Sequence, residues 1–267
     1  MDTPAKRFLL VNGTSQSVMD KDGGESESQY VRALEWTRAL RPKARSALVV
    51  GLGAGLLPKA LERRGLVADA YEIDPAIAGA ARAWFDYAPK GEVSIGDGRA
   101  ALERSERSWD LAFLDAFGAE SPPSHLFTAE FFLIVRERLA PGGVLAVNLV
   151  TSVDRRDAAA WTAVHKTLTT VFPSVRAFVA SEPSEGLANV LLFASTGPLE
   201  AGPPPAPESA RREVALMLSR ELKPSPADLS AATLLHDDHA PLEFLLAGTA
   251  RRWRRMLQES MSEVLLD

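Results

Sequence analysis

The sequence predicts an α/β protein with a mostly parallel β-sheet that ends in an antiparallel strand pair, preceded by a short N-terminal β-hairpin. Strand-like and helix-like segments alternate from residue 47 onward, which favours a parallel sheet with helices on both faces. The glycine-rich turn Gly51-Leu-Gly-Ala-Gly55 joins the first of these strands to a helix. Two later strand-like segments, 174–180 and 188–194, are separated by seven residues. A parallel crossover needs about a dozen residues, so this pair is expected to be antiparallel and the sheet to be Rossmann-like.

Composition narrows the class of protein. The chain of 267 residues is 46% hydrophobic and 24% charged, as expected of a globular protein with one large domain. Its net charge of −5 disfavours a nucleic-acid partner. The absence of cysteine excludes disulfides and thiolate chemistry. No apolar stretch reaches the ~18 residues of a membrane span, and the first residues lack the apolar core of a signal peptide. A cytoplasmic protein without membrane contact is expected.

The N-terminal segment, residues 1–40, is expected to form a hairpin and a helix. Two strand-like runs within residues 7–19 flank Asn12-Gly13, a strong signal for a two-residue hairpin turn. Residues 30–40 follow a helical pattern that stops before Pro42.

Residues 41–196 are expected to form the ligand-binding and catalytic domain. Strands are predicted at 47–51, 67–72, 91–95, 109–115 and 144–149, before the antiparallel pair. Helices are predicted at 55–64, 76–87, 128–139 and 155–171.

Residues 197–267 are expected to form a linker and a helical extension. The linker, 197–208, is too rich in proline for regular structure. Helices are predicted at 208–221 and 242–258, on either side of a loop that contains His236-Asp-Asp-His-Ala-Pro241.

The glycine spacing distinguishes between nucleotide ligands. A dinucleotide fingerprint would place its third glycine at position 56, which is leucine here, whereas this chain has Gly55. The third glycine, where a ligand can approach the backbone closely, therefore lies one residue earlier than in that fingerprint. This position favours a nucleoside without pyrophosphate, such as the adenosyl part of S-adenosylmethionine (AdoMet). A turn that serves only helix–strand packing is the alternative.

Acidic residues follow the next two predicted strands. Glu72 ends the second strand, 21 residues after Gly51, at a distance that suits a carboxylate accepting from both ribose hydroxyls. A helix-capping or surface acid is the alternative for Glu72, although Asp74 before Pro75 is the better capping candidate. Asp97 lies between two glycines, where it can reach an adenine amino group; a plain Asp-Gly turn is its alternative.

Asp115 ends the fourth predicted strand of this series. A loop of small residues and prolines leads from it to Thr128 and can cover a bound ligand. A carboxylate here can orient an amine and accept its proton, or it can only order the loop. His125 in the loop is expected to order it rather than to act as a base.

These motifs together resemble the spermidine synthase (polyamine aminopropyltransferase) family, which has the class I AdoMet-dependent transferase fold. Residues 9–20 resemble its N-terminal hairpin, and residues 125–131 (His-Leu-Phe-Thr-Ala-Glu-Phe) closely follow one of its motifs. The resemblance implies catalytic roles for Asp115 and Tyr30. It also implies that the co-substrate contacts Gln16, Gly51, Gly53, Gly55, Glu72, Ile73, Asp97, Gly98, Asp115 and Ala116.

The chain departs from this family on the side that binds the amine. The second acidic residue of the family's gate loop is Gly118 here, and the His and Glu that follow the family's tyrosine are Val31 and Arg32. The segment 237–243 resembles a C-terminal element of bacterial spermidine synthase-like proteins. The nucleoside side therefore matches the family and the amine side does not.

The resemblance implies transfer of an aminopropyl group from decarboxylated AdoMet to a small-molecule amine. Asp115 would orient and deprotonate the amine, with Tyr30 assisting and Asp237 or Asp238 adding negative charge. An AdoMet-dependent methyltransferase and a non-catalytic nucleoside-binding homologue are the alternatives. A nicotinamide dehydrogenase is disfavoured by Leu56. No metal is expected, because the histidines are scattered, and the family implies a homodimer.

Overall fold

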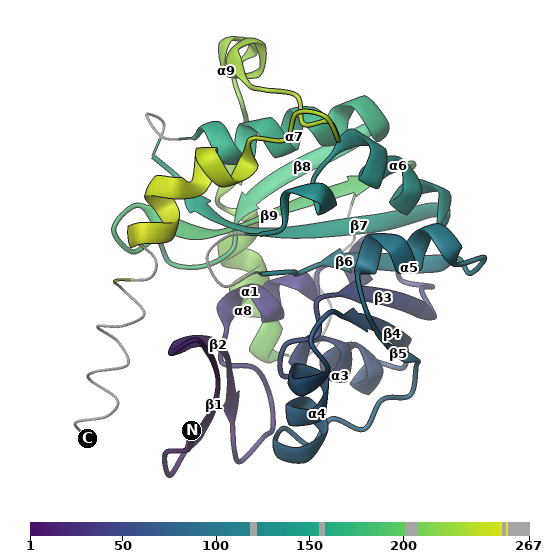
Figure 1. The fold of residues 1–267 in the computed structure, drawn as a ribbon, viewed down its shortest axis with the longest axis vertical. Coiled ribbons are helices and arrows are strands. Elements are labelled where there is room, and N and C mark those ends of the chain that lie inside the picture. The colour runs from purple at the N-terminus through teal and green to yellow at the C-terminus, as the bar shows by residue number, and fades with distance from the viewer. Residues whose placement is uncertain (118–121, 155–157, 201–207, 253–254, 256–267) are drawn as a thin grey trace.

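The computed structural model describes residues 1–117, 122–154, 158–200, 208–252 and 255. It consists of one large mixed sheet with helices on both faces and a separate N-terminal hairpin (Figure 1). Among the described residues, no helix is long and apolar enough to cross a membrane.

The large sheet has eight strands in the order β10-β8-β9-β7-β6-β3-β4-β5. The strands are β3 (Ser46–Val50), β4 (Val67–Glu72), β5 (Val93–Ile95), β6 (Trp109–Leu114), β7 (Leu139–Ser152), β8 (Ser174–Val179), β9 (Leu187–Ser195) and β10 (Glu221–Leu222). The strands β3 to β7 pair in parallel, and β9 pairs antiparallel with both β7 and β8. The predicted sheet and its antiparallel pair are confirmed, and β9 inserts between β7 and β8.

Alternation along the central strands builds two hydrophobic cores. In β3, Leu48 and Val50 face one core, whereas Ala47 and Val49 face the other. The first core is closed by α5 (Gly98–Arg104), α6 (Ala129–Glu137) and α7 (Ala159–Val171). The second is closed by α1 (Gln29–Leu34), α2 (Thr37–Leu40), α3 (Leu56–Arg63), α4 (Pro75–Trp84) and α8 (Glu208–Leu218). Because both faces are covered, the strands read as continuous apolar runs.

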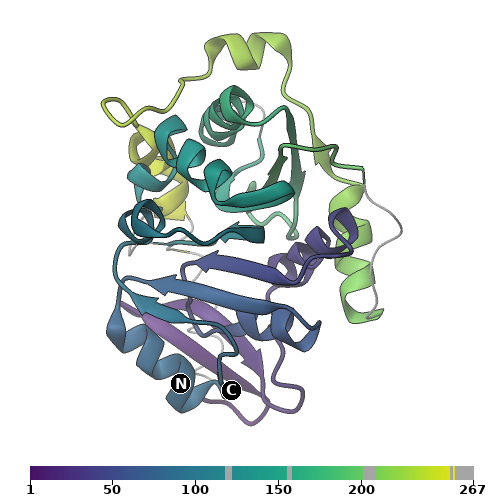
Figure 2. The same cartoon turned by 90° about the vertical axis from the view of Figure 1, so that its right-hand side faces the viewer.

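The N-terminal hairpin forms as predicted. Strands β1 (Lys6–Val11) and β2 (Thr14–Asp20) are joined by Asn12 and Gly13, which both have positive φ, as a tight hairpin turn requires. Leu9 and Met19 of the hairpin share a small core with Leu56 of α3 and Phe85 after α4. This packing holds the hairpin against α3 and α4 (Figure 2).

Several element boundaries differ from the sequence prediction. The helix predicted at 30–40 is interrupted at residues 35–36, where the buried Trp36 packs edge-on against Phe178 and Phe193. Strand β7 begins at Leu139, five residues before the predicted start, and runs through the Pro141-Gly142-Gly143 segment.

Among the described residues, four short elements were not predicted: α5, β10, α9 (Pro226–Ala231) and the 3-10 helix η1 (Ser124–Leu126). The C-terminal helix covers residues 242–252, and the rest of the predicted helix lies outside the described residues except for residue 255. Residues 201–207 of the predicted linker also lie outside them.

Candidate active site

A cavity of about 580 Å³ opens at the carboxyl ends of the central strands, between the large sheet, the hairpin and α1. This is where open α/β sheets bind ligands. All the predicted site residues except Gly55 line it: Gln16, Tyr30, Gly51, Gly53, Glu72, Ile73, Asp97, Gly98, Asp115 and Ala116. Gly118 lies outside the described residues.

Two glycines of the predicted nucleotide turn are needed for contacts within the chain. Gly51 has a φ of +95°, and a Cβ atom there would lie 2.3 Å from the carbonyl oxygen of Asp115. Gly55 has a φ of +74°, and its Cβ atom would lie 2.6 Å from the Tyr87 ring. Gly51 therefore allows the loop after β6 to touch the turn after β3. Gly55 serves helix packing, so the spacing argument that relied on it does not reflect ligand contact.

Glu72, at the end of β4, has a carboxylate that is fixed by backbone donors. Its Oε2 accepts from the Leu52 N–H and its Oε1 from the Asp74 N–H, both at 3.0 Å. The side chain is 6% exposed and lines the cavity, so it is not a surface acid. Asp74 caps α4 by accepting from the Ala76 N–H at 2.8 Å, as the sequence predicts.

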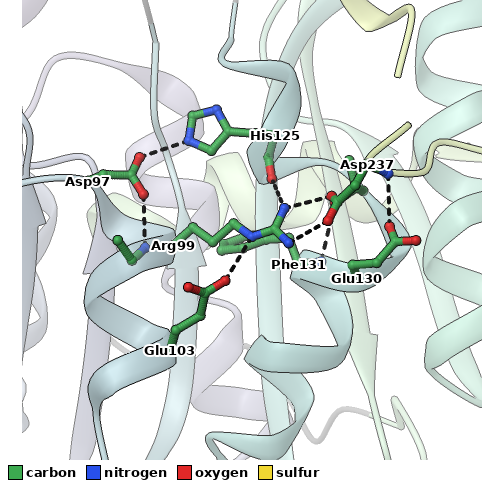
Figure 3. A network of polar contacts seen from close by, with 9 residues as sticks. Asp97, Arg99, Glu103, His125, Glu130, Phe131 and Asp237 are labelled. Atoms are coloured by element: carbon green, nitrogen blue, oxygen red, sulfur yellow. Dashed lines mark hydrogen bonds and ion pairs between the residues drawn. The ribbon is translucent and has the colours of Figure 1, made fainter. Parts of the chain in front are cut away.

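Asp97 has a double role at the start of α5. Its Oδ1 accepts from the Ala100 N–H at 2.9 Å and caps the helix, while its Oδ2 lies 2.8 Å from His125 Nε2 (Figure 3). Partial burial raises the pKa of Asp97, but the Ala100 and His125 hydrogen bonds lower it further, so the net pKa is below its ordinary value. His125 thereby ties the loop before α6 to α5, which agrees with its predicted ordering role.

Asp115, directly after β6, is held by two neutral donors. Its Oδ2 accepts from the Tyr30 hydroxyl at 3.2 Å, and its Oδ1 accepts from Asn148 Nδ2 at 2.8 Å. Burial raises the pKa of Asp115, and these two hydrogen bonds offset part of that increase. Burial and the charge of Asp115 raise the pKa of Tyr30 well above its ordinary value, so its hydroxyl stays protonated.

Sequence reasoning missed two asparagines that support Asp115. Asn189 Nδ2 donates to Asn148 Oδ1 at 3.0 Å, so a chain of amides leads from β9 through β7 to Asp115. Both side chains are buried, at 3% exposed for Asn148 and 7% for Asn189. The available signal was an amide inside an otherwise apolar strand, because a buried polar group needs partners.

The ionisable side chains that line the cavity are mostly acidic, and the one histidine among the described lining residues, His125, pairs with Asp97. The described part of the lining includes four carboxylates, Glu72, Asp74, Asp97 and Asp115, and no lysine or arginine. Such a lining attracts cations and offers no counter-charge to a phosphate. In the described part of the chain, no cluster of three or more histidine or acidic side chains could hold a metal.

Asp237 lies outside the cavity lining, in a cluster of charged groups beside it (Figure 3). Both of its oxygens accept from the Arg99 guanidinium at 2.6 Å, and Oδ1 also accepts from the Thr128 hydroxyl. Arg99 is the main reason that the pKa of Asp237 is lowered to about 2. Asp237 is thus paired with Arg99 and does not line the cavity, and the expectation that it adds negative charge for an amine stays a prediction. Asp238 is exposed and does not line the cavity either.

The two departures after Tyr30 have different positions. Val31 lines the cavity, whereas Arg32 pairs with Glu27 and Glu213 and does not.

Comparison with known proteins agrees with this geometry. A family model described as S-adenosyl-L-methionine-dependent methyltransferase matches residues 69–157. A probable polyamine aminopropyl transferase of Bifidobacterium longum is 29% identical over 272 residues, which cover 91% of this chain and 60% of the relative. A polyamine aminopropyltransferase of Vibrio vulnificus is 33% identical over 126 residues, which cover 45% of this chain and 42% of the relative. The chain thus spans less than two thirds of either relative's length.

The fold is shared with solved structures. A probable spermidine synthase from Corynebacterium glutamicum superposes with a TM-score of 0.70 at 22% identity, covering 88% of this chain and 90% of the other. By sequence and by fold, the chain is similar to polyamine aminopropyltransferases and spermidine synthases, and its residues 69–157 match the S-adenosyl-L-methionine-dependent methyltransferase family.

Proposed function

We propose that the chain transfers an aminopropyl group from decarboxylated AdoMet to an amine acceptor. The observation that carries this proposal is the charge of the cavity, which has four carboxylates and no lysine or arginine among its described lining residues. Decarboxylated AdoMet carries a sulfonium and an ammonium group and has no anionic group, so its charge complements this lining. The names of the two aminopropyltransferase relatives support the same reaction.

The nucleoside would bind at the β3–β4–β5 end of the cavity. Glu72, held by two backbone donors, keeps lone pairs for the ribose hydroxyls. Asp97 would accept from the adenine amino group, and Ile73, which is 69% exposed, offers apolar surface to the base. Gln16 reaches the same cavity from the hairpin.

Asp115 would prepare the amine for attack. A primary amine has a pKa near ~10.4, so it arrives mostly as an ammonium ion. The Asp115 carboxylate attracts this ion, orients it and accepts a proton from it, and burial raises the pKa of Asp115 toward that task. The freed lone pair forms a C–N bond to the propyl carbon on sulfur while the C–S bond breaks. The sulfonium becomes a neutral thioether, methylthioadenosine, the product leaves as a secondary ammonium ion, and Asp115 releases the proton that it accepted to solvent.

Methyl transfer from AdoMet is the second candidate, because the methyltransferase family model matches residues 69–157. The two co-substrates differ by one carboxylate. In this cavity that carboxylate would meet an anionic lining, which supports the decarboxylated form.

The proposal is tested by product analysis. Purified protein is incubated with an amine mixture and either decarboxylated AdoMet or AdoMet, and the released nucleoside is identified by chromatography. We expect methylthioadenosine from decarboxylated AdoMet, dependent on amine. Release of S-adenosylhomocysteine from AdoMet, with no methylthioadenosine, would establish methyl transfer instead.

A further inference from the structure

The residues that line the cavity can be ordered by the strand to which they belong. This order divides the cavity into two halves. The lining residues on or directly after the strands, taken across the sheet from β5 to β8, are Asp97, Glu72, Gly51, Asp115, Asn148, Asn189 and Ser181. The half on β5, β4 and β3 is the proposed nucleoside site. Asp115 on β6 stands at the junction, and the half on β7, β9 and β8 extends beyond it. We call this second half the far half.

The far half is built from uncharged hydrogen-bonding groups. Asn189 donates its backbone N–H to the Ser181 hydroxyl at 2.9 Å and its side-chain amide to Asn148. Gln29, at the start of α1, closes this end by accepting from the Glu182 N–H at 2.8 Å. Ser28 lines the same cavity beside Gln29. These contacts fix amide and hydroxyl groups around the space beyond Asp115.

Among the described lining residues, no charged side chain lies in the far half beyond Asp115. Among the described lining residues, the other carboxylates, Glu72, Asp74 and Asp97, belong to the nucleoside half. Glu182, next to Ser181, does not line the cavity and pairs with Arg220 at 2.5 Å. A second ammonium group placed in the far half would therefore be desolvated without a counter-charge, which is costly. A hydroxyl or amide there would find matching partners.

We infer that the acceptor is a monoamine whose other end is uncharged and carries a hydroxyl or amide group, rather than a diamine. This inference rests on the proposed function and specifies its acceptor. The single amino group lies at Asp115, where it loses its proton and attacks, and the uncharged end lies among Asn189, Ser181 and Gln29.

Matched acceptors test the inference. With decarboxylated AdoMet, we compare kcat/KM for 4-aminobutan-1-ol and 1,4-diaminobutane, which differ only in a hydroxyl against an ammonium group, by following methylthioadenosine release. We expect the amino alcohol to be preferred by about tenfold or more. Equal use of both acceptors, or preference for the diamine, would overturn the inference while leaving aminopropyl transfer intact. No methylthioadenosine with either acceptor would overturn the proposed function and the inference together.

A variant tests whether the far half causes the preference for the amino alcohol. In Gln29→Glu, one carboxylate oxygen can still accept from the Glu182 N–H, and the other adds a negative charge to the lining. We expect the ratio of kcat/KM for diamine to that for amino alcohol to rise about tenfold or more. The control, Ala215→Glu, adds the same charge on an exposed position of α8, outside the cavity, and should leave the ratio unchanged. An unchanged ratio in Gln29→Glu, or an equal rise in the control, would contradict the assignment of the far half.

Discussion

Two cavity carboxylates are held by neutral donors and not by cations. Glu72 is held by two backbone N–H groups, and Asp115 by the hydroxyl of Tyr30 and the amide of Asn148. Asp237 shows the contrast, since Arg99 pairs with both of its oxygens. A neutral donor orients a carboxylate without cancelling its charge, which leaves that charge available to a cationic ligand.

Removing the amide beside Asp115 should shift the pH dependence of transfer. In Asn148→Leu, the carboxylate loses a hydrogen bond that lowers its pKa, so its pKa rises further. Because the proposed transfer needs the deprotonated form of Asp115, the acidic limb of kcat/KM against pH should move to higher pH. Tyr30→Phe should move it in the same direction.

The control for these variants is the dissociation constant of methylthioadenosine at neutral pH, measured by calorimetry, which should stay close to that of the unmodified protein. An acidic limb that does not move in either variant would remove the hydrogen bonds to Asp115 from the mechanism.

Gly55→Ala should lower stability rather than nucleoside affinity. A Cβ atom at this left-handed position strains the backbone and meets the Tyr87 ring, so we expect a loss of about 1–3 kcal/mol in the free energy of unfolding. Gly79→Ala is the matched control, because Gly79 lies in α4 with open space around it. That variant should gain up to about 1 kcal/mol. Urea denaturation measures both, and equal effects would contradict the packing role of Gly55.

At the scale of elements, the C-terminal segment joins the helices that border the proposed nucleoside site. Asp237 binds Arg99 in the first turn of α5 and Thr128 at the start of α6 (Figure 3). His236 and the Asp237 N–H both contact Glu130 in α6. The segment thus fixes α5, whose cap is Asp97.

Breaking this connection should weaken nucleoside binding from outside the cavity. In Asp237→Asn, the charged pair with Arg99 is lost and α5 is less constrained, so we expect methylthioadenosine to bind several-fold more weakly in calorimetry. Asp238→Asn, a change at the exposed neighbour, should leave the affinity unchanged. Equal affinities in both variants would show that the segment does not support the site.

The pairing of Asp237 with Arg99 also predicts that the free energy of unfolding decreases at acidic pH. The pKa of Asp237 is about 2 in the folded chain, below its ordinary value of 3.8. Its contribution to stability is therefore complete above about pH 4 and is lost as the pH falls toward 2. Urea denaturation at pH 5 and pH 3 should show a smaller decrease for Asp237→Asn than for the unmodified chain. An identical decrease would contradict the pairing.

Across the whole molecule, the pattern of strand-like and helix-like segments was enough to predict the sheet, and Asn12-Gly13 was enough to predict the hairpin turn. The pattern could not predict α5, because Asp97-Gly98 is equally compatible with a turn and with a helix cap. The carboxylates were predictable because each one lies at the end of a strand or within two residues of it. Asn148 and Asn189 were not, because their partnership depends on the insertion of β9 beside β7, which only the folded sheet reveals.

The glycine-rich turn illustrates the same limit. Its spacing correctly marked the turn after β3, yet Gly51 and Gly55 are explained by contacts with Asp115 and Tyr87 that lie far along the chain. The predicted homodimer stays a prediction.

The central claim, that an anionic cavity selects a co-substrate without a carboxylate, is tested most directly by calorimetric titration of the unmodified protein with decarboxylated AdoMet and with AdoMet. Since the described lining offers four carboxylates and no lysine or arginine, we expect the decarboxylated form to bind about tenfold more tightly or better. Tighter binding of AdoMet would contradict the claim.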